Sequence, residues 1–88
     1  MTYDKNKERA CPMSALPIGI TGAIEALSEN GRGISWRLRE LGFREGCTVT
    51  CVGKSPLGGM RAYRVMGGVI ALRDEDAATV STLYGSQT

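Results

Sequence analysis

Histidine is absent from this sequence of 88 residues. The chain therefore lacks the commonest transition-metal ligand and the side chain that most often transfers protons at neutral pH. A Ser–His catalytic pair is excluded, and several carboxylates fall in loop and helix positions that water reaches, namely Glu25, Glu29, Glu40 and Glu45. Three neighbouring acids at positions 74–76 are explained by the dipole of a helix that begins there. We predict no catalytic residue, no metal site, no cofactor and no enzymatic activity.

Long apolar runs are also absent. No stretch approaches the about 18 residues that a membrane helix needs, and the N-terminal region lacks the charged, hydrophobic and cleavable segments of a signal peptide. We therefore predict a cytoplasmic protein without direct insertion into a membrane. A length of 88 residues fits one domain, because single domains run from about 50 to 200 residues.

Charge of either sign is in little excess, since the formal net charge is +2. This net charge is too small for the electrostatic attraction to phosphates that nucleic-acid-binding proteins use, so we expect no nucleic-acid partner. Arginine outnumbers lysine by 8 to 3, and guanidinium groups are favoured at protein interfaces because they make bidentate contacts with carboxylates and phosphates. The arginines that could serve an acidic partner are Arg32, Arg37, Arg39, Arg44, Arg61 and Arg64.

The chain has three cysteines. An odd number in a chain without an export signal argues against a disulfide framework. Cys47 and Cys51 stand four residues apart in a predicted strand, which separates them by about 13 Å. A disulfide needs Cα atoms within about 7 Å. We predict that Cys51 is a small core residue and that Cys47 stands at the entry of the strand.

The N-terminal half predicts one helix and one strand. Residues 1–11 carry almost nothing apolar and are predicted to be a flexible leader, and a single helical turn is expected near Met13 because Pro17 blocks a longer helix. Residues 21–28 predict a strand with a bulge, because strict alternation would not place both Ile24 and Leu27 on one face. The helix begins at Ile34, and its core-facing stripe is Ile34, Leu38 and Leu41. Gly42 supplies a left-handed end that folds Phe43 back on Leu38.

The C-terminal half predicts strands at 48–54, 61–66, 69–73 and 79–83, joined by turns at 55–59 and at Gly67–Gly68. A capped helical turn follows Asp74. The pattern is five short antiparallel strands with one helix inserted after the first strand. It predicts a small barrel, because closure removes exposed sheet edges. The predicted domain covers residues 12–84, and residues 85–88 are a flexible tail.

Trp36 lies about 160° from the core-facing stripe of the predicted helix, with Arg39 and Glu40 as its nearest neighbours. A large aromatic side chain on the face away from the core is expected to be covered by another segment or by a partner. It is covered by the leader or a loop, it anchors a protein partner as Trp and Arg do in interface hot spots, or it supports dimerisation. The sequence leaves these three alternatives open.

The sequence resembles the FeoA family over about four fifths of its length. The resemblance is carried by the segments RLRELGFREGCTV, SPLGG and IALRDEDAATV, with Leu16, Pro17 and Gly19 before them. It implies an SH3-like barrel with a helix after the first strand, similar to the barrel at the end of iron-dependent DtxR-type repressors. It also implies a small cytosolic partner of bacterial ferrous-iron uptake, working with the membrane GTPase transporter FeoB. Trp36 and Cys51 depart from the family pattern.

The leading hypothesis is therefore a non-enzymatic regulator of FeoB-type ferrous iron transport that acts by protein–protein binding. Its predicted partner surface combines the outer helix face with a loop: Trp36, Arg37, Arg39, Glu40, Leu57, Gly58 and Gly59. A free-standing SH3-like adaptor that binds a peptide is the alternative. A small nucleic-acid-binding protein is a third hypothesis, and the nearly balanced charge counts against it. Homo-oligomerisation stays open.

Overall fold

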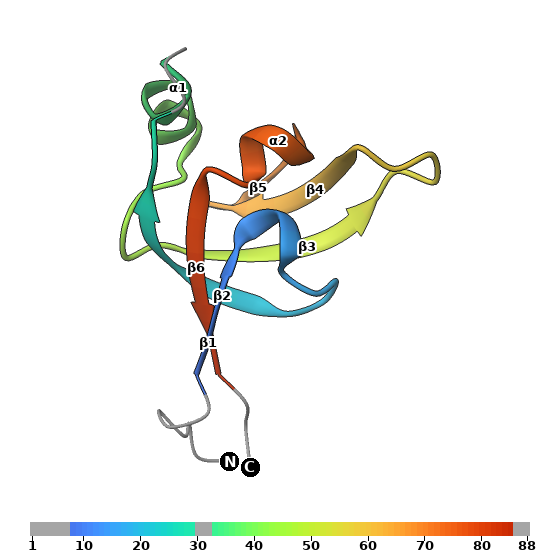
Figure 1. Cartoon of the computed structure of the whole chain (residues 1–88), viewed down its shortest axis with the longest axis horizontal. Helices are drawn as coiled ribbons and strands as arrows, with labels where there is room; N and C mark the ends of the chain where they lie inside the picture. Colours follow the sequence, from blue (N-terminus) through green and yellow to red (C-terminus); the bar gives the residue numbers. More distant parts are fainter. Residues whose placement is uncertain (1–7, 30–32, 86–88) are drawn as a thin grey trace.

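The computed structural model describes residues 8–29 and 33–85. Within them, six strands form one antiparallel sheet in the order β1, β6, β2, β3, β4, β5 (Figure 1). The strands are β1 (Arg9–Pro12), β2 (Thr21–Leu27), β3 (Thr48–Lys54), β4 (Met60–Val65), β5 (Gly68–Arg73) and β6 (Val80–Tyr84). The helical elements are the 3-10 turn η2 (Met13–Ala15), α1 (Ile34–Leu41) and α2 (Asp74–Ala77). The predicted mainly β architecture with a short helix is confirmed.

The N-terminus differs from the prediction, because Arg9–Pro12 forms strand β1 inside the region expected to be a flexible leader. This strand pairs along β6, from Arg9 opposite Tyr84 to Pro12 opposite Ser81. Its four residues are mostly exposed, so the ladder of hydrogen bonds with β6, and not apolar burial, defines it. Residues 1–7 of the predicted leader and 86–88 of the predicted tail lie outside the described residues.

The hydrogen-bonded ladder does not close the barrel completely. Complete closure was predicted because it would leave no exposed sheet edges. The strand order begins at β1 and ends at β5, and no pairing joins these two strands within the described residues. Each therefore keeps one edge without a neighbouring strand.

A bulge and a turn show how the local sequence sets the geometry. Strand β2 shifts register between Ile24 and Ala26 where it pairs with β6, so the predicted bulge is confirmed. The β4–β5 turn lies one residue earlier than predicted, with positive φ angles at Met66 (49°) and Gly67 (81°). Val65 pairs with Gly68 across it, which makes it a two-residue hairpin of the type that the right-handed twist of strands favours.

Helix α1 ends as predicted, with one exception. Gly42 adopts φ 109°, and the amide of Phe43 donates a 2.9 Å hydrogen bond to the carbonyl of Leu38, which is the Schellman pattern. Ile34 and Leu38 are buried, but Leu41 is 41% exposed, so its predicted core position is wrong. The chain reverses at Gly42 and brings the buried Phe43 into the core at this end of the helix.

The core is one cluster that draws on η2, α1, α2 and five of the strands. Tyr63 stands within it and meets Phe43 edge to face, with 6.4 Å between ring centroids. Cys51 is fully buried, which confirms its predicted role as a small core residue. The other members of the cluster are Met13, Leu16, Ile24, Ile34, Leu38, Val49, Val65, Leu72, Ala77 and Val80.

Candidate partner-binding surface

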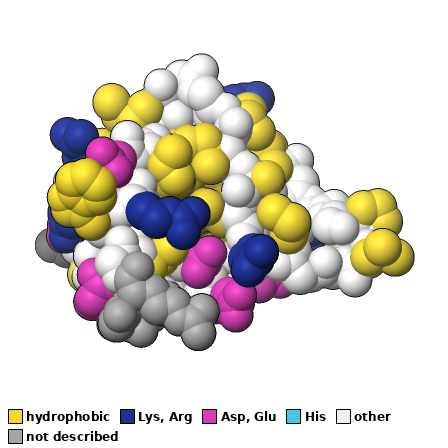
Figure 2. Space-filling view, turned by 90° about the horizontal axis from the view of Figure 1, so that it is seen from above, with side chains coloured by type: hydrophobic (Ala, Val, Ile, Leu, Met, Phe, Trp, Pro, Cys, Tyr) yellow, Lys and Arg dark blue, Asp and Glu magenta, His cyan; other side chains and the backbone are white. Residues whose placement is uncertain are grey.

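Trp36 projects from the outer face of α1, and 65% of its surface is exposed. No described loop covers it, and residues 1–7, which were the other predicted cover, lie outside the described residues. Figure 2 shows hydrophobic side chains exposed on the face that carries α1 and α2. An exposed tryptophan beside arginines has the composition of an interface hot spot.

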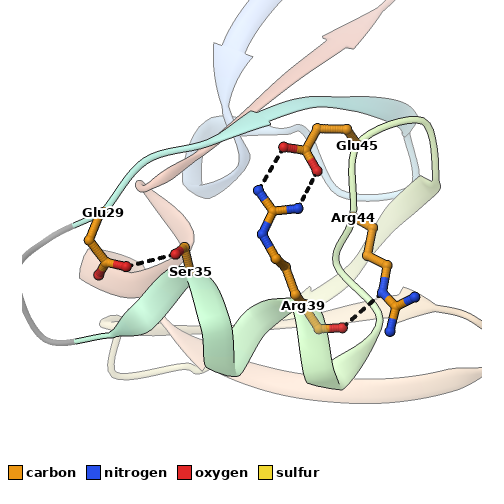
Figure 3. A network of polar contacts seen from close by, with 5 residues as sticks. All are labelled: Glu29, Ser35, Arg39, Arg44 and Glu45. Atoms are coloured by element: carbon orange, nitrogen blue, oxygen red, sulfur yellow. Dashed lines mark hydrogen bonds and ion pairs between the residues drawn. The ribbon is translucent and has the colours of Figure 1, made fainter.

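The N-terminal end of α1 is held by a carboxylate. Glu29 accepts a 3.0 Å hydrogen bond from the amide of Ile34. It also accepts a 2.7 Å hydrogen bond from the Ser35 hydroxyl (Figure 3). The N-cap residue Gly33 has no side chain to do this, and an acid at the helix N-terminus also faces the positive end of the helix dipole. Glu29 is exposed, as its loop position predicted. Its contact with the helix start was not predicted, since its spacing from the helix matches no standard capping motif.

The C-terminal end of α1 is held by Arg39, Arg44 and Glu45 (Figure 3). The Arg39 guanidinium donates two hydrogen bonds to the Glu45 carboxylate, at 2.5 and 2.7 Å. The Arg44 Nε atom donates a 3.1 Å bond to the Arg39 carbonyl. Hydrogen bonds from Arg39 lower the pKa of Glu45 from 4.5 to about 2, and the same contact raises the pKa of Arg39. Arg39 is therefore engaged within the chain, although its side chain stays 42% exposed.

Arg37 and Glu40 are exposed on α1. Arg37 borders a hollow of about 270 Å³ whose other lining residues come from β4, β5 and α2. A second hollow of about 360 Å³ adjoins the first, since Met60 and Ala71 line both. Sequence patterns do not reveal these hollows, because they depend on pairing between strands that are distant from α1 in the chain.

The loop half of the predicted surface lies elsewhere. Leu57 is 97% exposed at the turn between β3 and β4, and Gly58 and Gly59 there have φ of 81° and 85°. Figure 1 places this turn at the opposite end of the longest axis from α1. The structure therefore separates the seven predicted residues into two groups and does not bring the loop to the helix face.

Acidic and sulfur side chains do not converge among the described residues, where no three Cys, Asp or Glu gather closely enough to hold a metal ion. Cys11, Cys47 and Cys51 are free thiols. Cys47 is half-buried just before β3, at the strand entry predicted for it. The helices in the described part of the chain are too short or too polar to cross a membrane.

Comparison with known proteins places this geometry in a family. The FeoA domain model matches residues 11–82. The structure of Stenotrophomonas maltophilia FeoA in complex with zinc, described as a prokaryotic SH3 domain protein and a proposed ferrous iron transport activating factor, is 33% identical. Its TM-score is 0.71, and the match covers 80% of this chain and 86% of that chain. No curated protein matches the chain significantly.

Two further structures extend the comparison. Iron(II) transport protein A from Clostridium thermocellum is 25% identical, with a TM-score of 0.76 over 83% of this chain and 44% of that chain. A manganese-dependent transcriptional repressor shares the fold alone, at 15% identity and a TM-score of 0.77 over 85% of this chain and 41% of that chain. The predicted SH3-like fold is thus confirmed, and the chain belongs to the FeoA domain family, which is associated with ferrous iron transport.

Proposed function

We propose that this chain is a non-catalytic cytoplasmic accessory protein of ferrous iron uptake, which binds the cytoplasmic part of a FeoB-type membrane GTPase transporter. The observation that carries the proposal is the exposure of Trp36 on α1 in a chain of the FeoA family. A binding protein of this kind acts by favouring one conformation of its partner, and it can do so only through different affinities for the two conformations.

The way in which α1 is fixed supports its use as a binding element. Glu29 holds the first turn, and Gly42 and Arg44 hold the last. A helix whose ends are both held loses little further freedom when a partner binds, so more of the contact energy appears as affinity. Trp36, Arg37 and Glu40 are exposed side chains of this helix, while Arg39 supports the helix end by its contact with Glu45.

The test is co-purification of the chain with the full transporter, followed by GTPase assays with and without the chain. Trp36→Ala should weaken association by about tenfold or more, the loss typical of an aromatic hot spot. Ile18→Ala is the matched control, because Ile18 is also an exposed apolar residue, at 50%, but lies outside α1. Leu57→Ala tests the separate loop group on its own.

Equal association of the Trp36→Ala variant and the unmodified chain would remove the helix face from the proposal. Absence of any association between the unmodified chain and the transporter would refute the proposal itself. A change in GTP hydrolysis on binding would identify the nucleotide cycle as the step that the chain regulates.

A further inference from the structure

Strand β5 has one free edge, and the structure shows which backbone groups face it. On its other edge β5 pairs with β4, from Val65 opposite Gly68 to Met60 opposite Arg73. In a two-residue hairpin the pair next to the turn is hydrogen-bonded, and bonded and non-bonded pairs then alternate. The non-bonded residues are therefore Val69, Ala71 and Arg73. The amides of these residues point away from β4, toward the free edge.

The hollow beside Arg37 borders the C-terminal half of β5. It is lined by Ala71, Leu72 and Arg73 in succession, and successive side chains of a strand point to opposite faces of the sheet. Met60, which lies opposite Arg73 on β4, and Asp76 of α2 also line it. The hollow therefore lies at the C-terminal end of β5, where this strand borders Arg37 of α1.

The floor of the adjoining hollow is formed by small residues. Gly53 pairs with Ala62 and Ala62 pairs with Ala71, so three small residues stand side by side across β3, β4 and β5. All three line this hollow. These three positions leave room for the side chains of an added strand, while Lys54, Met60 and Arg61 line the rest of the hollow. Ala71 itself is exposed, and Val69 is 58% exposed.

Most of the charged side chains that line the two hollows are positive. Arg37 and Lys54 form no ion pair with a described residue, and Arg73 lies 3.8 Å from Glu75 with both side chains more than 70% exposed. Arg61 lies 3.8 Å from Asp74, and among the described residues Asp76 is the one carboxylate that lines either hollow. Figure 2 shows Lys, Arg, Asp and Glu side chains beside hydrophobic ones on the face that carries α1 and α2. A second copy of the chain would bring the same cations against this edge, which like-charge repulsion disfavours.

We propose that the free edge of β5 receives an extended acidic segment of the partner, which adds as a seventh strand and places carboxylates near Arg37 and Arg73. This mode of recognition takes its affinity from main-chain hydrogen bonds and its selectivity from side chains. The inference rests on the proposed function, because it takes the segment to belong to the cytoplasmic part of the transporter. It specifies the chemistry of that segment: extended backbone, small or apolar side chains on one face, and Asp or Glu.

Hydrogen–deuterium exchange of the full chain, with and without the purified transporter, tests the main-chain contact directly. The amides of Val69 and Ala71 should exchange quickly in the free chain and become protected in the complex. The amides of β1, the other edge strand, serve as the internal control and should not change. This measurement uses the unmodified chain, so it does not depend on the folding of any variant.

A proline substitution tests the same contact by removal of one donor. Ala71→Pro deletes an amide that does not bond to β4, so it spares the β4–β5 ladder and should weaken transporter binding by about tenfold. Ala10→Pro, the same change on β1, is the matched control. Arg73→Ala should weaken binding about two- to fivefold in low salt and have little effect in high salt, with Arg9→Ala on β1 as its control.

The outcomes separate this inference from the proposed function. Protection of the β5 amides, together with weaker binding of Ala71→Pro, supports the edge contact. A transporter complex in which the β5 amides exchange as in the free chain would overturn the inference and leave the proposed function standing. Protection that appears with concentrated chain alone would identify a second copy as the occupant and would also overturn it. A chain that does not bind the transporter at all contradicts both proposals.

Discussion

The phenol of Tyr63 donates a 3.1 Å hydrogen bond to the main-chain carbonyl of Met13, and both residues are fully buried. The bond joins the middle of β4 to the 3-10 turn η2, fifty positions earlier in the chain. The pKa of Tyr63 is raised above its ordinary value of 10.0. Burial is the largest cause, and the nearby Cys51 is the next. The phenol therefore stays protonated and remains a donor.

Tyr63→Phe should lower the free energy of unfolding by about 1–2 kcal/mol, because it leaves a buried carbonyl without its donor. Urea unfolding followed by circular dichroism measures the change. Tyr84→Phe is the control, since Tyr84 is half-buried and its hydroxyl bonds to no described residue. A Tyr63→Phe variant as stable as the unmodified chain would show that the bond to Met13 contributes nothing.

The contact between Arg39 and Glu45 predicts a dependence of stability on pH. The pKa of Glu45 falls from 4.5 to about 2 in the folded chain, so the folded state binds its proton less readily than the unfolded state. The stabilising contribution is then complete above pH 4.5 and is lost as the pH falls toward 2. An NMR titration of the Glu45 carboxyl carbon measures this pKa directly. In Arg39→Gln the pKa of Glu45 should return toward 4.5, and an unchanged low pKa in that variant would show that Arg39 is not its cause.

Gly42 is required both for its backbone conformation and for its lack of a side chain. Its φ is 109°, and a Cβ atom there would lie 2.7 Å from Cγ of Met66. Gly42→Ala should lower the free energy of unfolding by about 1–2 kcal/mol. Gly46→Ala is the matched control, because Gly46 has φ 88° and open space around its Cα, so it carries the conformational cost alone.

Met66 separates the two contributions at Gly42. This side chain is 73% exposed, and its Cβ atom would lie 3.2 Å from the added Cβ. Met66→Ala in the Gly42→Ala background removes Cγ but keeps this Cβ, so it should recover the part of the loss that comes from crowding by Cγ. The free energies of unfolding of the four chains form a double-mutant cycle. A Gly42→Ala variant that loses no more stability than Gly46→Ala would contradict the crowding.

The features that the sequence predicted correctly are those that neighbouring residues determine. Ile24 and Leu27 could not share one face of a regular strand, and β2 contains the bulge. Gly42 and Phe43 end α1 in the predicted way. Strand β1 was missed because Arg9–Pro12 carries little apolar pattern and is defined by pairing with β6, about seventy residues away.

The candidate site was predictable only in part, for a related reason. The helical wheel placed Trp36 on the outer face of α1, where it is exposed. The wheel could not show that Arg39 bonds to Glu45 across the turn at Gly42, or that Leu57 lies far from the helix. The free edge of β5 follows from the strand order, which hydrophobic patterns within single segments do not encode.

Trp36 is the single tryptophan of the chain, which makes its exposure directly measurable. Its 65% exposed surface predicts that iodide quenches its fluorescence efficiently in the free chain, and Trp36→Ala should change the free energy of unfolding by less than about 0.5 kcal/mol. Incorporation of 5-fluorotryptophan gives one fluorine resonance, free of signals from the unlabelled transporter. That resonance should shift or broaden on binding if the helix face is the contact. A resonance that stays unchanged in a chain already shown to associate would place the contact away from Trp36, with the β5 edge as the next surface to test.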